Sequence, residues 1–152
     1  MWKADRAEAP EVATLLALFR DWFGRTEPAE HRLLAGVEHL LEGGEAEFLL
    51  GAPHGGEAAA GVCQLRYRFG IWYGAPDCLL EDLFVTEAAR GSGLGRALLE
   101  GAIERAREHG CRRVELDVNE GNAAAYALYE SFGFSARSSG LDGNDLMMRL
   151  RL

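Results

Sequence analysis

The sequence predicts an α/β domain, in which helices alternate with strands along the chain. In several segments apolar residues recur at three- and four-residue steps, which is typical of amphipathic helices. Other segments alternate apolar and polar residues or are continuously apolar, which is typical of strands. The length of 152 residues is enough for one domain with a core and too short for two ordinary ones. We therefore expect residues 1–152 to form a single domain.

The first half of the chain predicts a strand, two helices and a hairpin. Pro10 lies in the first turn of the first helix, with acidic side chains near its positive end, and Gly43 and Gly44 end the second helix. The expected elements are a strand over 2–6, a helix that opens at 8–11 and runs to about 23, a helix over 28–41, and strands over 47–50 and 58–69 around a turn at 53–56.

The second half predicts two strand–helix units and a terminal hairpin. Gly110 and Gly133 are expected to stop the two helices. The expected elements are strands over 79–85 and 113–118, helices over 94–109 and 122–131, and a hairpin over 134–150 with its turn at 140–143.

A loop between the strands over 58–69 and 79–85 is rich in large apolar residues: Phe69, Ile71, Trp72 and Tyr73. The favoured interpretation is packing at the edge of the core, since such side chains are usually buried. The alternatives are a wall of a substrate pocket or a contact between subunits.

The segment Arg90–Arg96 (Arg-Gly-Ser-Gly-Leu-Gly-Arg) lies where the strand over 79–85 gives way to a helix. A glycine-rich turn that opens a helix leaves backbone N–H groups unpaired at the positive end of the helix dipole, and such a turn binds phosphate. The dinucleotide pattern G-x-G-x-x-G fails from Gly91 and from Gly93, and there is no lysine for a nucleotide P-loop. The pattern that fits is R-x-x-G-x-G.

With Glu81-Asp82-Leu83-Phe84-Val85 before it, this segment resembles the acetyl-CoA motif of the GNAT family (GCN5-related N-acetyltransferases). The stretch from Asn122 to Phe134 is similar to the family's N-x-x-A-x-x-L-Y-x-x-x-G-F helix. Within the family, the E-D-L-F-V segment most resembles the diamine and polyamine acetyltransferases, including those that act on thialysine. The resemblance implies a mixed sheet of six or seven strands flanked by about four helices, with the first strands antiparallel and the two motif strands parallel.

The resemblance also implies that acetyl-CoA is the co-substrate, and it assigns residues to it. Its pantetheine arm would add to the sheet beside Leu83, Phe84 and Val85. The implied cofactor-binding residues are Leu83, Phe84, Val85, Arg90, Gly91, Ser92, Gly93, Leu94, Gly95, Arg96, Asn122 and Ala125.

Acetyl transfer to an amine needs a group that takes a proton and a group that gives one. A free alkyl amine has a pKa near about 10.4 and is protonated at neutral pH. Strand alternation puts Glu81 and Asp82 on opposite faces, so that only one faces the thioester. The resemblance favours Glu81 as the base, with Asp82 as a solvated or structural partner. It favours Tyr129 as the acid for the leaving thiolate, and Tyr126, one turn earlier, is the competing assignment.

Composition limits the partners. The formal net charge of −8 argues against nucleic acid and suits a cationic small molecule, or simply solubility. The histidines and the three cysteines show no metal-ligand spacing, so we expect no metal. There is no signal-peptide pattern and no apolar run of about 18 residues, so we expect a cytoplasmic protein that does not enter a membrane. A homodimer is expected from the resemblance alone.

The leading hypothesis is an N-acetyltransferase that acts by direct attack of the primary amine of a small cationic acceptor, polyamine-like or amino-acid-like. Two alternatives stay open: acetylation of a protein amino terminus or lysine, and a non-catalytic acyl-CoA-binding regulatory module.

Overall fold

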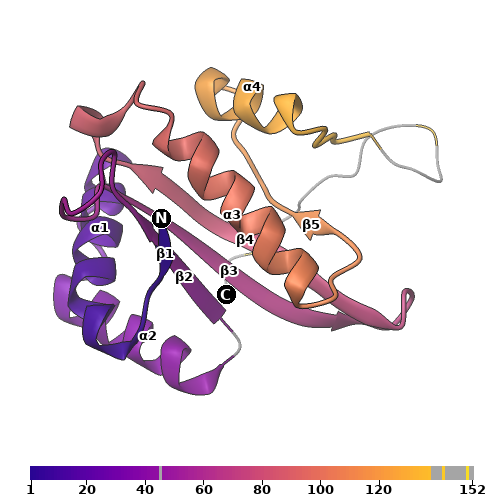
Figure 1. Cartoon of the computed structure of the whole chain (residues 1–152), viewed down its shortest axis with the longest axis horizontal. Helices are drawn as coiled ribbons and strands as arrows, with labels where there is room; N and C mark the ends of the chain where they lie inside the picture. Colours follow the sequence, from indigo (N-terminus) through magenta and orange to yellow (C-terminus); the bar gives the residue numbers. More distant parts are fainter. Residues whose placement is uncertain (45, 138–141, 143–149, 151–152) are drawn as a thin grey trace. The chain divides into compact units, whose positions relative to one another are not determined.

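Five strands form one mixed sheet in the order β1-β2-β3-β4-β5 (Figure 1). β1 to β4 pair antiparallel and β5 pairs parallel to β4, which confirms the expected directions. The computed structural model describes residues 1–44, 46–137, 142 and 150. It divides into two compact units, residues 1–116 and 117–152, and the expectation of a single domain stays a prediction.

The first unit holds the sheet and three α-helices. Its strands are β1 (Trp2–Lys3), β2 (Ala46–Gly51), β3 (Gly61–Gly70), β4 (Ala75–Val85) and β5 (Val114–Glu115). Its helices are α1 (Ala9–Trp22), α2 (Glu30–Gly43) and α3 (Leu94–Glu108), with short 3-10 turns at η1 (Arg6–Glu8) and η2 (Glu87–Ala89). The second unit contains α4 (Ala123–Ser131).

The two faces of the sheet are covered by different helices (Figure 1). On one face α1 and α2 bury a core that includes Phe48, Val62 and Phe84. On the other face α3 lies over β2, β3 and β4. Because neighbouring residues of a strand point to opposite faces, Leu50 belongs to the first core and Leu49 faces α3.

Helix α3 packs directly on the backbone of two paired glycines, Gly51 and Gly61. A Cβ atom on Gly61 would lie 2.8 Å from Leu98 Cδ1, and one on Gly51 would lie 2.7 Å from Leu94 Cδ1. Real Cβ atoms do not lie this close, so a side chain at either position would force the ends of these leucine side chains to shift, and glycine lets α3 lie close to the sheet. The contact fixes the first turns of α3 against the end of the sheet.

The helices agree with the sequence prediction to within a few residues, and the strands differ more. The first strand ends at Lys3, because Asp5 accepts a hydrogen bond from the Ala7 N–H and caps the η1 turn instead. β3 begins at Gly61 rather than 58, and β4 begins at Ala75 rather than 79. The described residues form five strands where six or seven were expected. The expected hairpin over 134–150 lies largely outside the described residues.

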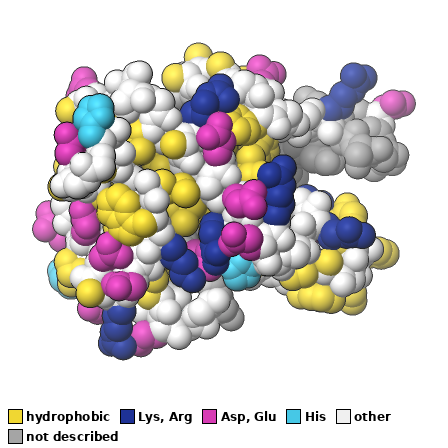
Figure 2. Space-filling view, in the orientation of Figure 1, with side chains coloured by type: hydrophobic (Ala, Val, Ile, Leu, Met, Phe, Trp, Pro, Cys, Tyr) yellow, Lys and Arg dark blue, Asp and Glu magenta, His cyan; other side chains and the backbone are white. Residues whose placement is uncertain are grey.

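The aromatic loop is the exposed tip of the β3–β4 hairpin, so the expectation of core packing was wrong. Trp72 is 94% exposed and Ile71 is 81% exposed, and Phe69 and Tyr73 are exposed as well. Figure 2 shows hydrophobic side chains gathered at this end of the hairpin. The hairpin extends beyond the helices that cover the rest of the sheet, which explains the exposure (Figure 1).

Candidate active site

The glycine-rich turn between η2 and α3 presents bare backbone amides. Gly91 and Gly93 have positive φ angles of 79° and 87°, and Gly93 is the N-cap of α3. Within the described residues no hydrogen bond is made by the N–H groups of Gly91, Gly93 or Gly95. The Leu94 N–H donates to Ser92 Oγ at 3.3 Å, and Ser92 Oγ donates to the Ala89 carbonyl at 2.7 Å. The turn therefore has the geometry of a phosphate site at a helix N-terminus.

The carboxyl end of β4 has an edge that β5 does not cover. β5 pairs with β4 only at Cys78 and Leu79. The Thr86 N–H donates to the Ala60 carbonyl on the β3 side. Because successive N–H groups along a strand point to alternate edges, those of Val85 and Leu83 point to the uncovered edge. This edge can accept an extended ligand as an additional strand, ending at the glycine-rich turn.

A cavity of about 400 Å³ lies between the sheet and the two helices α1 and α2. Asp82 and Gln64 form its polar floor on β4 and β3. Its walls are mainly apolar, and its charged lining residues outside the sheet come from α1, α2 and the loop between them. The remaining lining residues are Leu16, Phe19, Arg20, Phe23, Arg25, Glu27, Pro28, Arg32, Leu33, Gly36, Val37, Leu40 and Phe48.

The expected separation of Glu81 and Asp82 onto opposite faces was wrong. Gln64 is opposite Asp82 and Leu65 is opposite Leu80, so Glu81 is the extra residue of a β-bulge. Gln64 Nε2 donates to Glu81 Oε2 at 2.8 Å, and the Gln64 side chain also lines the cavity beside Asp82. The bulge therefore brings both carboxylates next to the same amide.

Asp82 is partly buried, so of its two expected roles the structure does not favour the solvated one. Burial of the carboxyl, together with the charge of Glu81, raises the pKa of Asp82 to about 6. Glu81 is the more exposed of the two, and its carboxylate lies 3.8 Å from Arg66 Nη1. Sequence reasoning passed over Asp82. The available signal was Gln64, a polar residue in the apolar segment Gly-Val-Cys-Gln-Leu of the neighbouring strand.

An aromatic cluster connects the cavity with the glycine-rich turn. The Phe84 ring stacks on Phe19 with centroids 5.1 Å apart, and Phe19 stacks on Trp22 at 6.1 Å. The guanidinium of Arg90 lies 5.7 Å from the centroid of the Trp22 ring, and its Nε donates to the Val85 carbonyl at 3.4 Å. The end of α1 thus lies against both the cavity and the first residue of the phosphate-binding motif.

The second unit carries the remaining residues predicted for the site. Asn122 is the N-cap of α4, where its Oδ1 accepts from the Ala125 N–H at 3.3 Å. Tyr129 is 8% exposed and its ring packs edge-on against Phe134, whereas Tyr126 is 38% exposed. Gly133 has a φ of 86° and follows the helix, as expected.

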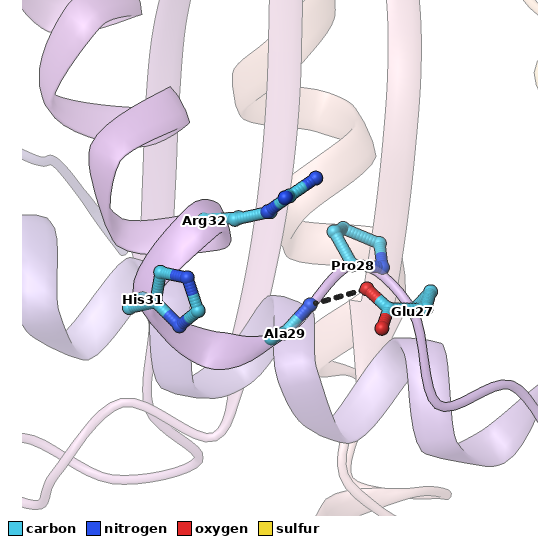
Figure 3. A pocket seen from close by; sticks show the side chains of 5 residues that line it. All are labelled: Glu27, Pro28, Ala29, His31 and Arg32. Carbon is cyan, nitrogen blue, oxygen red and sulfur yellow. Dashed lines mark hydrogen bonds between the residues drawn. The ribbon is translucent and has the colours of Figure 1, made fainter.

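A second hollow, of about 610 Å³, adjoins the cavity and shares Glu27, Pro28 and Arg32 with it. Figure 3 shows His31 and Arg32 projecting from the first turn of α2, with Arg32 extending toward the side of Pro28 and Glu27. The Ala29 N–H donates to Glu27 Oε2 at 3.1 Å. This hollow contains no residue of the sheet, so we place the candidate reaction centre in the inner cavity.

Among the described residues, no group of three or more His, Cys, Asp and Glu side chains is arranged to hold a metal ion. None of the helices described is both long enough and apolar enough to span a membrane.

Comparison with known families agrees with this geometry. The profile of the Acetyltransferase (GNAT) family matches residues 12–134, so the chain belongs to the GNAT family. The chain has the α/β fold of that family.

Individual relatives differ in the acceptor that their names give. The chain is 32% identical over 117 residues to the thialysine N-epsilon-acetyltransferase of Bos taurus, covering 77% of this chain and 62% of that protein. It is 54% identical over 59 residues to the ribosomal protein bS18-alanine N-acetyltransferase of Escherichia coli strain K12, and this match covers 39% of this chain and 40% of that protein. The matches thus cover less than two thirds of these relatives. A crystal structure from Arthrobacter sp. FB24, assigned as an acetyltransferase, has a TM-score of 0.88 and 30% identity, covering 99% of this chain and 94% of that one.

Proposed function

We propose that this protein transfers an acetyl group from acetyl-CoA to the primary amine of a small acceptor held in the cavity on β3 and β4. The observation that carries the proposal is the carboxyl of Asp82 at the floor of that cavity, next to Gln64, whose side chain also donates to the neighbouring Glu81. The uncovered edge of β4 and the bare amides of the glycine-rich turn lie at the carboxyl end of the same strand.

When bound, acetyl-CoA would supply a thioester whose acyl carbon is open to attack. The amine forms a bond to that carbon and the carbon–sulfur bond breaks. One proton passes from the amine to a carboxylate of the Glu81–Asp82 pair, and one passes to the leaving sulfur. In this proposal the N–H of Val85, which points to the uncovered edge of β4, would donate a hydrogen bond to the thioester oxygen.

Sequence reasoning selected Glu81 as the base, and the cavity favours Asp82. A general base must reach the proton that it takes, and Asp82 lines the cavity. Glu81 lies one residue earlier on the bulge and is not among the residues that line the cavity, but its charge acts on Asp82. We assign proton removal to Asp82, with Glu81 as the residue that raises its pKa.

The remaining site residues are carried over as proposals from the family motif. Tyr129 is proposed as the acid that protonates the leaving sulfur, with Tyr126 as the competing candidate. The proposed cofactor-binding residues of the second motif are Asn122 and Ala125. A cytoplasmic location and a homodimer also stay predictions.

The acceptor class is the finer part of the proposal. A polyamine-like or amino-acid-like acceptor is supported by the similarity to the bovine thialysine enzyme. A protein amino terminus is supported by the similarity to the bS18-alanine enzyme over a shorter stretch.

The test has two arms. Calorimetry of the purified protein with acetyl-CoA measures whether the cofactor binds, and release of free CoA over a panel of small amines and amino-terminal peptides identifies the acceptor. Binding without turnover on any amine would favour the regulatory module instead. Absence of acetyl-CoA binding would overturn the proposal.

A further inference from the structure

The charges of the cavity differ between its floor and its rim. The floor is acidic, with Asp82 on the sheet. The other charged lining residues are Arg20, Arg25, Glu27 and Arg32, from α1, α2 and the loop that joins them. Thus arginine outnumbers acid at the rim, although the whole chain has a formal net charge of −8.

Two of these arginines have no carboxylate partner in the part of the chain that the structure describes. The guanidinium of Arg25 lies 5.4 Å from the centroid of the Phe23 ring, and this contact with a neutral ring does not neutralise the charge of Arg25. The guanidinium of Arg32 makes no hydrogen bond or ion pair with the described residues. Both side chains are exposed at the rim. We call Arg25 and Arg32 the rim arginines.

The other two charged groups of the rim already have partners. Arg20 donates to Asp21 Oδ1 at 2.8 Å and to the Pro28 carbonyl at 2.8 Å. Glu27 accepts from the Ala29 N–H through Oε2. The first turn of α2, where Arg32 lies, also carries the positive end of a 14-residue helix. The rim arginines are therefore the charged groups most available to a ligand.

Between the floor and the rim the walls are apolar. Phe19 and Leu16 come from α1, and Leu33 and Leu40 come from α2. Such walls suit a chain of methylene groups or a ring, and they offer nothing to a charge in the middle of the ligand.

From this distribution we infer that the acceptor is a primary amine whose far end carries an anionic group such as a carboxylate. Its amine lies at Asp82, its apolar body lies between the helices and the sheet, and its anionic end pairs with the rim arginines. Guanidinium and carboxylate form strong charge-assisted hydrogen bonds, whereas a second ammonium at the rim would be repelled. The inference rests on the proposed function, and it selects the amino-acid-like acceptor over the polyamine-like one.

Three probes of the same length separate the possibilities: 6-aminohexanoate, hexylamine and 1,6-diaminohexane. They share an amine and a six-carbon chain and differ only in the charge of the far end. With acetyl-CoA and detection of released CoA, we expect kcat/KM to be highest for 6-aminohexanoate and lowest for the diamine. An advantage of about tenfold or more over hexylamine corresponds to one charged hydrogen bond.

Charge reversal tests the assignment to the rim. Arg32→Glu should invert the preference, so that the diamine becomes a better acceptor than 6-aminohexanoate. Arg112→Ala removes an exposed arginine of the α3–β5 loop that is not part of the cavity, and it should leave the order of the three probes unchanged. Thermal unfolding of each variant checks that the fold is retained.

Binding of the same probes to the CoA-saturated protein, measured by calorimetry, separates this inference from the proposed function. A wild-type preference for the diamine, equal affinity for all three probes, or an unchanged order in Arg32→Glu would overturn the inference and leave acetyl transfer standing. Preferential binding of 6-aminohexanoate with no CoA release from any amine would overturn the proposed function and leave the charge preference standing.

Discussion

Arg105 and Glu47 are joined by two hydrogen bonds, from Nε to Oε2 at 2.8 Å and from Nη2 to Oε1 at 2.6 Å. These two hydrogen bonds connect the C-terminal part of α3 to the start of β2. Lys3 Nζ donates to Glu47 Oε1 at 3.0 Å, and the Tyr67 hydroxyl donates to Glu47 Oε2 at 3.2 Å. His109 Nε2 lies 3.0 Å from Glu47 Oε1. Glu47 is thus a buried carboxylate with four partners, and it holds the end of α3 that is remote from the glycine-rich turn.

Replacing Glu47 by Gln should lower the free energy of unfolding by about 2 to 4 kcal/mol at neutral pH, because it removes the buried negative charge that pairs with Arg105 and Lys3. Thermal or urea unfolding measures this. Glu104→Gln is the matched control: its pairing with Arg107 is exposed, at 3.5 Å, and its loss should cost less than about 1 kcal/mol. Equal effects of the two substitutions would contradict a structural role for the Glu47 cluster.

The same cluster predicts a pH dependence of stability. Burial alone would raise the pKa of Glu47, but hydrogen bonds from Arg105, Lys3 and His109 outweigh it and lower the pKa from 4.5 to about 2. A depressed pKa contributes stability that is present above 4.5 and is lost as the pH falls toward 2. The difference in unfolding free energy between the wild type and Glu47→Gln should therefore shrink across this window. A constant difference would argue that Glu47 is not ionised in the folded state.

Gly93→Ala should weaken acetyl-CoA binding by about tenfold or more, because a φ of 87° is strained for any L side chain and the strained turn loses its amide geometry. Calorimetry measures the affinity. Gly110, at the other end of α3, has a φ of 71° and an equally open surrounding, so Gly110→Ala is the control. Gly110→Ala should lower the free energy of unfolding by a similar amount, about 1 to 2 kcal/mol, and leave the affinity for acetyl-CoA unchanged. If both variants bind acetyl-CoA like the wild type, the turn is not the phosphate site.

The sequence predicted the helices well because their apolar residues recur on one face over two or more turns, as in α1 from Val12 to Phe19. Their ends were marked by local chemistry, such as the left-handed Gly44 after α2. The glycine-rich turn was predicted equally well, since its conformation is set by glycines that lie within one short segment.

The bulge at Glu81 could not be predicted, because it depends on the register between β3 and β4 rather than on any residue at the site. A period of two assigns Glu81 and Asp82 to opposite faces, and one extra residue cancels that assignment. The sequence also could not show which residues line the cavity together, since residues such as Arg25 and Asp82 are far apart in the chain. Residues at the hairpin tip, such as Trp72, are of types that are usually buried in a core, so their exposure could not be predicted from residue type.

Asp82→Asn should reduce kcat by about a hundredfold or more, because it removes the proposed base from the cavity. In the wild type the rate should rise with pH through about 6, since only the ionised carboxylate accepts a proton and the pKa of Asp82 is raised to about 6. Glu81→Gln keeps that base and removes a neighbouring negative charge, so the acidic limb of its profile should move to lower pH. The other charged groups that line the cavity, Arg20, Arg25, Glu27 and Arg32, are unchanged in both variants. A hundredfold loss in Glu81→Gln with little change in Asp82→Asn would restore Glu81 as the base.

Tyr129→Phe removes only the hydroxyl, so a proton donor and a packing residue respond differently to it. If Tyr129 protonates the leaving sulfur, kcat should fall by about a hundredfold while the affinity for acetyl-CoA is retained. Tyr126→Phe is the matched variant one turn earlier on α4, and it should keep most of the activity, since its side chain is the exposed one. The opposite result would transfer the role to Tyr126. A loss of stability in Tyr129→Phe with unchanged kcat would make Tyr129 a core residue of its unit, packed against Phe134.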